Sequence, residues 1–209
     1  MFKTLTMWLL LVLCEVLVVA AFFSPDSVVE NLRREQRMTR ASFGDVTEQH
    51  VRQAADGWFT SAFHDTGIVR HSFQLFIPTQ EAREKSTGLE DLGSEAFPWF
   101  RRRMETVWNG IYQSLYRFSV LLEVLPFMLP LIIPAIVDGF MTREVKKRTY
   151  GYASPIRYYA SMHAVAALIV AIPAYLVFPL PVPPLFVPLW AVSVAIILAV
   201  MTSNIQKKV

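Results

Sequence analysis

The chain has 209 residues, of which 54% are hydrophobic and only 18% charged, and its mean hydropathy is +0.37. These values lie above those of an ordinary soluble domain and argue against a purely water-soluble fold. The formal net charge of +3 is too small to indicate nucleic-acid binding by itself. The single cysteine, Cys14, excludes a disulfide framework and a cysteine-based metal site.

Four apolar runs are each long enough to cross a bilayer as a helix. They cover residues 5–23, 118–140, 159–178 and 184–201. At about 1.5 Å per residue, each run approaches the ~30 Å thickness of the hydrocarbon core. The sequence therefore predicts an all-α membrane protein with four transmembrane helices.

The first run has features of a cleavable signal peptide, because Lys3 precedes it and small residues lie near its end. Glu15 interrupts the apolar region, however, and the run is long enough to span the membrane. We therefore expect residues 1–23 to form an uncleaved N-terminal transmembrane anchor.

The polar segment 24–117, between the first and second spans, carries 12 of the 20 basic and 13 of the 17 acidic residues. Ser24, Pro25 and Asp26 are typical of a helix start, with Ser as the N-cap and Pro at the first helical position. This predicts a helix to about residue 41.

Further along the polar segment, apolar residues near helical spacing predict a second helix over 45–64. The stretch 66–93 contains glycines and a proline and predicts irregular structure, with a short extended piece at 72–77. From residue 94 a helical pattern runs without a breaker into the second span. Its aromatic face is expected to pack against the other helices of the segment, the alternative being a binding platform. The polar segment is thus predicted to be mainly helical.

The C-terminal region, 118–209, should contain three transmembrane helices with a basic loop at 141–158. In this loop Arg143, Lys146, Lys147 and Arg148 outnumber the single acid Glu144, and the chain ends in a lysine pair. The positive-inside rule therefore places this loop and both termini in the cytoplasm, and the polar segment on the opposite side.

Charged groups within the spans indicate function by default, because their burial in lipid is costly. Glu15 and Glu123 lie at related depths, so a shared proton or cation pathway is one hypothesis. The alternative is that each is protonated or bonded locally. Near the inner end of the second span, Asp138 needs a cation, which predicts a polar cluster of Asp138, Arg143 and His163. Such a cluster would pin the second span to the third or dock another subunit.

Pro126, Pro130 and Pro134 recur every four residues along one stripe of the second span. Each lacks an N–H, so the carbonyls four residues earlier lose their helical partners in a medium without water. The stripe should therefore face protein, either within this bundle or on a partner subunit.

One stretch resembles a known family through a run of motif residues that closes the second span and opens the third. These are Pro134, Asp138, Gly139, Arg143, Lys146, Lys147, Arg148, Ser154, Pro155, Tyr158, Tyr159 and His163. The pattern is similar to that of TraJ-type inner-membrane proteins of integrating conjugative elements and conjugative plasmids. The resemblance implies a role in conjugative DNA transfer at the bacterial inner membrane, beside the coupling ATPase of a type IV secretion system. It implies no catalytic residue.

Three functional hypotheses follow. The leading one is a non-enzymatic membrane component of conjugative DNA transfer, with no cofactor and no metal. Its expected partners are other membrane subunits in a hetero- or homo-oligomer, the coupling ATPase, anionic lipid at the basic loop, and nucleic acid only indirectly or transiently. The alternative is a small transporter or ion-conducting subunit that uses the intramembrane carboxylates. A third is an enzyme in the polar segment, based on His50, His64, Asp65 and His71, although no hydrolase or metal-ligand motif supports it.

Overall fold

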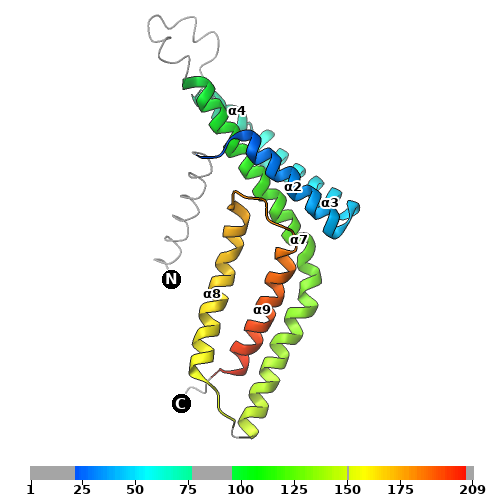
Figure 1. The fold of residues 1–209 in the computed structure, drawn as a ribbon, viewed down its shortest axis with the longest axis vertical. Helices are drawn as coiled ribbons and strands as arrows, with labels where there is room; N and C mark the ends of the chain where they lie inside the picture. Colours follow the sequence, from blue (N-terminus) through cyan, green and yellow to red (C-terminus); the bar gives the residue numbers. More distant parts are fainter. Residues whose placement is uncertain (1–21, 77–95, 150, 206–209) are drawn as a thin grey trace, which may run out of the picture. The chain divides into compact units, whose positions relative to one another are not determined.

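The computed structural model describes residues 22–76, 96–149 and 151–205. In chain order the elements are α2 (Pro25–Phe43), α3 (Asp45–Phe59), the π-helical turn η1 (Thr60–His64), α4 (Ile68–Phe76), α7 (Ala96–Arg148), α8 (Pro155–Val177) and α9 (Phe186–Ser203) (Figure 1). No strand occurs in these ranges, which confirms the predicted all-α class.

Three helices are long and apolar enough to cross a membrane, namely Phe97–Arg148, Pro155–Val177 and Phe186–Ser203. They contain the second, third and fourth predicted spans and support a membrane protein. The first predicted span, 5–23, lies almost entirely outside the described residues, so the count of four spans stays a prediction.

The chain divides into two compact units that share α7. The first unit comprises Met1–Ser119 with Leu176–Val182, and the second comprises Val120–Tyr175 with Pro183–Val209. α7 is one uninterrupted helix of 53 residues, as expected from the absence of a breaker before the second span.

In the first unit, α2 begins at the N-cap that the sequence predicts and ends at Phe43, two residues beyond the predicted end. The Ser24 hydroxyl accepts a hydrogen bond from the backbone N–H of Ser27 at 3.2 Å, and Pro25 occupies the first turn. Gly44, at φ +90°, ends α2 and leads directly into α3. The two helices bury Val28 and Val51.

The aromatic face of α7 packs against α3 and η1, which confirms the packing interpretation of these residues. Trp108 meets Phe59 and Phe63 in edge-on contacts, with ring centroids 6.1 and 5.4 Å apart. Tyr112 contacts Phe59 at 5.6 Å, and its hydroxyl hydrogen-bonds to Asp56 at 2.5 Å. Edge-to-face geometry of this kind is favoured by the ring quadrupoles.

The extended piece predicted at 72–77 is wrong, because α4 covers Ile68–Phe76. The helix starts after Gly67, which adopts φ +74° and accepts the backbone N–H of His71. Ser72 then receives the indole N–H of Trp108 at 3.1 Å. A tertiary contact thus overrides the weak strand propensity of the segment.

In the second unit, α9 lies between α8 and the C-terminal half of α7 (Figure 1). α7 and α9 are in close contact at Gly139, where a Cβ atom would collide with Thr202 Oγ1 and lie 2.7 Å from the Ala199 carbonyl oxygen. Small residues permit such close approach between membrane helices.

Between α8 and α9, the indole N–H of Trp190 donates to the Leu168 carbonyl at 2.9 Å. Pro173, inside α8, has no N–H to donate to the carbonyl of Ile169, which is the residue after Leu168. This hydrogen bond joins α8 to α9 one residue before the carbonyl affected by the proline.

Replacing Gly139 by Ala should destabilise the second unit. Overpacking costs about 1–3 kcal/mol, which exceeds the gain of about 1 kcal/mol from helix propensity. Gly110, in the same helix, has no atom within 4 Å of its Cβ position, so Gly110→Ala is the matched control. Thermal unfolding in detergent micelles should show a lower Tm for Gly139→Ala and an unchanged or higher Tm for Gly110→Ala. Equal midpoints for the two variants would contradict the close approach.

Candidate functional site

Two cations of α7 hold the C-terminal end of α9. Arg143 Nε donates to the Ile205 carbonyl at 3.1 Å. Lys146 Nζ donates to the Ser203 carbonyl at 3.2 Å and to Asn204 Oδ1 at 3.4 Å. The last carbonyls of a helix lack donors within the helix and carry partial negative charge, so cations stabilise them.

Asn204 also ties the α7–α8 connection to this end of α9. Its side-chain oxygen accepts the backbone N–H of Ser154 at 3.2 Å, and its amide donates to the Val200 carbonyl at 2.8 Å. The end of α7, the start of α8 and the end of α9 therefore meet through one buried asparagine.

An open cavity of about 290 Å³ lies at the same place, and we refer to it as the basic cavity. Arg143, Lys146 and Lys147 line it, together with the connection at 151–153 and Ser203 and Ile205 of the α9 end. No acidic residue is among its lining residues.

The predicted basic loop 141–158 is helical as far as Arg148, because α7 continues to that residue, and its cations form two groups. Arg143 and Lys146 contact α9, whereas Lys147 and Arg148 pair with Glu144 on the surface, at 2.8 and 3.9 Å. The side chain of Arg148 is 81% exposed. Surface pairs of this kind stabilise little, so Lys147 and Arg148 remain available to a partner.

The predicted cluster of Asp138, Arg143 and His163 does not form. Asp138 and His163 are exposed, and within the described ranges no ion pair or hydrogen bond links either of them to Arg143. The reason is helical geometry, since residues five apart point away from each other on an α-helix. The Arg143 guanidinium consequently turns to the α9 carbonyl.

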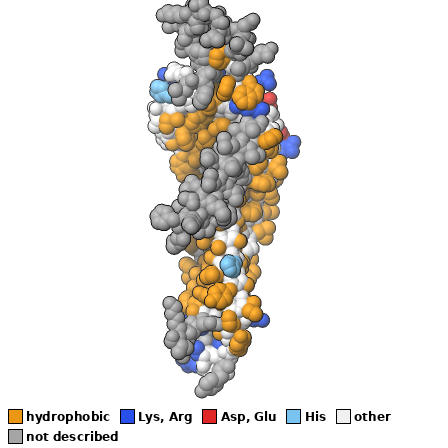
Figure 2. Space-filling model, turned by 90° about the vertical axis from the view of Figure 1, so that its left-hand side faces the viewer, with side chains coloured by type: hydrophobic (Ala, Val, Ile, Leu, Met, Phe, Trp, Pro, Cys, Tyr) orange, Lys and Arg blue, Asp and Glu red, His pale blue; other side chains and the backbone are white. Residues whose placement is uncertain are grey.

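The proline stripe lies inside α7, as predicted, but the described bundle does not cover it. Pro126, Pro130 and Pro134 are all exposed. Figure 2 shows hydrophobic side chains spread over the surface of this half of the chain. The predicted pairing of Glu15 with Glu123 cannot be followed, because residue 15 lies outside the described residues; Glu123 is half-buried.

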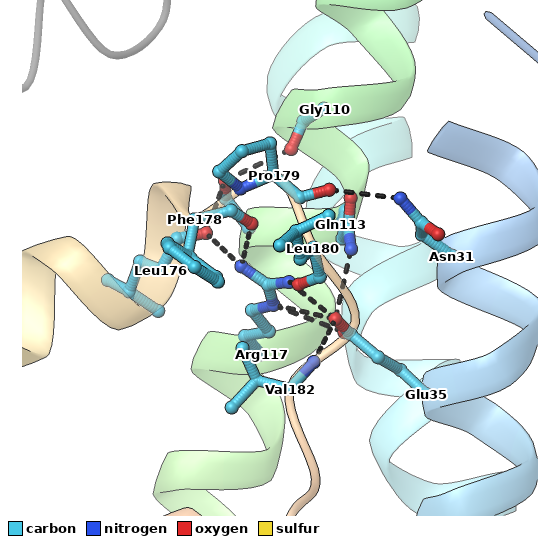
Figure 3. A network of polar contacts seen from close by, with 11 residues as sticks. Asn31, Glu35, Gly110, Gln113, Arg117, Leu176, Phe178, Pro179, Leu180 and Val182 are labelled. Carbon is cyan, nitrogen blue, oxygen red and sulfur yellow. Dashed lines mark hydrogen bonds and ion pairs between the residues drawn. The ribbon is translucent and has the colours of Figure 1, made fainter. Parts of the chain in front are cut away.

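A buried ion pair organises the first unit and has no counterpart among the predicted site residues. Arg117 Nε donates to both carboxylate oxygens of Glu35 at 3.1 Å, and Arg117 Nη2 donates to Glu35 Oε1 (Figure 3). The two side chains are 1% and 3% exposed. Gln113 Nε2 and the backbone N–H of Val182 add hydrogen bonds to Glu35 at 3.0 and 3.1 Å.

The remaining donors of Arg117 satisfy the proline-rich segment 176–182. Its Nη groups donate to the carbonyls of Leu176, Phe178 and Leu180, the last at 2.7 Å. Asn31 adds a bond to the Pro179 carbonyl at 3.0 Å (Figure 3). Arginine suits this position because its planar fork bonds several acceptors at once without losing its charge.

The sequence held a signal for this pair. Glu35 lies seven residues after Val28 and four before Thr39, both of which are buried, so the acid occupies the buried face of α2. Arg117 follows directly on the buried Tyr116 of α7. A charge on an otherwise buried helix face implies a buried partner of opposite sign.

Two residues of the enzyme hypothesis, His64 and Asp65, lie next to each other on the surface. His64 Nδ1 lies 3.8 Å from Asp65 Oδ1, and both side chains are largely exposed. Among the residues that the structure describes, no group of three His, Cys, Asp or Glu side chains is placed to hold a metal ion.

Comparison with known proteins gives one family. A family model described as "IncC plasmid conjugative DNA transfer protein DtrJ-like" matches residues 19–208. No curated protein and no solved structure matches the chain. The match supports the expectation of conjugative transfer, whereas the TraJ-type relationship stays a prediction.

Removing the Arg117 guanidinium should strongly destabilise the first unit. Breaking a buried pair on one side costs about 3–5 kcal/mol, because a buried charge is left without its partner. Arg117→Met should therefore lower the Tm in detergent far more than Arg101→Met, which removes an exposed cation of the same helix. Arg117→Lys should restore little of the lost Tm, because an ammonium group cannot reproduce the several hydrogen bonds of the planar guanidinium. A small shift for Arg117→Met would argue against this network.

Proposed function

The chain belongs to the DtrJ-like family of plasmid conjugative DNA transfer proteins, and from this we propose that it is a non-enzymatic inner-membrane component of the transfer apparatus. Its partner is the coupling ATPase of the type IV secretion system or an adjoining membrane subunit. The observation that carries the proposal is a family match that includes all seven described elements.

The proposed topology has four spans, with 5–23 as the first, and both termini in the cytoplasm. The bonds of Arg143 and Lys146 to the α9 end support it, because they bring the cations of α7 and the C-terminal part of the chain to one membrane face. Lys207 and Lys208 follow in the sequence. Concentration of basic charge at one face favours the cytoplasmic side.

The cytoplasmic contact surface consists of Lys147 and Arg148. They project from the end of α7, and neither bonds to α9. Lys146 is excluded from this surface because its ammonium group contacts Ser203 and Asn204. A basic surface of this kind suits an acidic face of the coupling ATPase.

The membrane contact surface is the proline stripe of α7. The carbonyls that Pro126, Pro130 and Pro134 leave without helical donors need satisfaction in lipid, and the described bundle leaves the prolines exposed. A helix of another membrane subunit, or of a second copy, would cover the stripe and supply polar or close backbone contacts.

Charge reversal at Lys147 and Arg148 should impair transfer without preventing insertion. We expect the transfer frequency to fall by about tenfold or more, which corresponds to about 1.4 kcal/mol of lost partner binding. A mating assay measures the frequency, and reporter fusions verify insertion. Arg101→Glu with Arg102→Glu, on the opposite side of the membrane, is the matched control. Unchanged transfer by the Lys147/Arg148 variant would remove this surface from the proposal.

Reporter fusions at the two ends should report the same compartment. Even numbers of crossings return the chain to its starting side, and the basic loop assigns that side to the cytoplasm. A cytoplasm-active reporter should work at both termini, and a periplasm-active reporter should work within 77–95. Termini on opposite faces would contradict four spans.

A further inference from the structure

The basic cavity has the chemistry of a phosphate site. Three cations line it and no acid does. Arg143 uses Nε on the Ile205 carbonyl, while its two Nη groups have no partner among the described residues. Lys147 contributes a further ammonium group, one of whose three donors bonds to the exposed Glu144 at 2.8 Å, and Lys146 has a third donor beyond its two bonds to the α9 end. A guanidinium fork beside ammonium groups matches the oxygens of a phosphate.

The surroundings of the cavity indicate that this phosphate belongs to a membrane lipid. The cavity lies where three helices of membrane-spanning length end or begin, at Arg148, Pro155 and Ser203. Large side chains just before and at the start of α8 are exposed, with Tyr152 at 79% and Ile156 at 80%. Tyrosine and basic residues together are typical of the headgroup level of a bilayer.

The size of the cavity also favours a lipid headgroup over duplex DNA. About 290 Å³ admits a single phosphate headgroup, whereas duplex DNA would touch only the exposed cations outside it. Basic pockets between membrane helices on the cytoplasmic side commonly receive anionic headgroups.

We propose that the basic cavity binds the phosphate group of an anionic phospholipid, phosphatidylglycerol or cardiolipin, of the cytoplasmic leaflet. The lipid neutralises the cations that converge on the α9 end and thereby stabilises the junction of α7, α8 and α9. The proposal rests on the membrane orientation of the proposed function but requires no role in DNA transfer.

Lys147 and Arg148 provide a matched pair for the test. They are neighbours in sequence and both pair with Glu144, but only Lys147 lines the basic cavity. Neither contacts α9, so Lys147→Gln and Arg148→Gln should both fold. Lys147→Arg keeps the charge and serves as the conservative variant.

The full-length protein in mild neutral detergent is titrated with phosphatidylglycerol or with phosphatidylcholine, and its thermal unfolding is followed by tryptophan fluorescence. Phosphatidylglycerol should raise the Tm of the wild-type protein and of Arg148→Gln, and phosphatidylcholine should not. For Lys147→Gln the apparent affinity should fall about fivefold, the change expected for about 1 kcal/mol per basic residue at an anionic surface. Lys147→Arg should restore it.

Four results would overturn the inference. Equal effects of the two lipids would deny headgroup selectivity, and equal losses in Lys147→Gln and Arg148→Gln would indicate diffuse surface attraction. Saturation by inorganic phosphate at the same concentration would assign the cavity to a soluble anion. Protection by a short DNA duplex instead of lipid would assign the cations to nucleic acid. Because the readout is lipid binding, failure here leaves the transfer phenotype of the proposed function as a separate question.

Discussion

Backbone carbonyls near membrane helix ends must find donors, and in this protein cations on α7 supply them. Arg117 donates to three carbonyls of the segment that follows α8, and Arg143 and Lys146 donate to carbonyls at the end of α9. Both sets of acceptors lie at the C-terminal ends of helices, where the helix dipole favours positive charge. One long helix therefore serves as the donor for both of the spans that follow it.

This constraint explains why Arg117 and the cations at the end of α7 differ in their roles. Arg117 is fully buried and its charge is balanced by Glu35, so its function is to hold structure. Arg143, Lys146 and Lys147 line the basic cavity, which has no acid among its lining residues in the described part of the chain and carries excess positive charge. Removing one partner of such a buried pair is strongly destabilising, whereas the unbalanced positive charge of the basic cavity is the basis of the proposed lipid site.

The motif residues acquire physical roles through the same contacts. Gly139 permits α9 to approach α7, Arg143 and Lys146 bond to the end of α9, and Ser154 starts α8 beside Asn204. These residues build one junction of three helix ends. As a member of the DtrJ-like family, the chain combines this junction with a proline stripe that the described residues leave exposed, and the proposed assembly with other membrane subunits rests on that stripe.

The sequence by itself determined the helical class, the three described membrane-length helices and the N-cap of α2, and it favoured packing for the aromatic face of α7, because each depends on local periodicity, length or capping chemistry. Only the tertiary structure decided the partners of the charged groups. Asp138 and Arg143 are close in sequence yet do not pair, while Glu35 and Arg117 are 82 residues apart and do. Which charged groups pair depends on which helix faces meet. A pattern along the sequence cannot specify that, nor which donors reach which carbonyls.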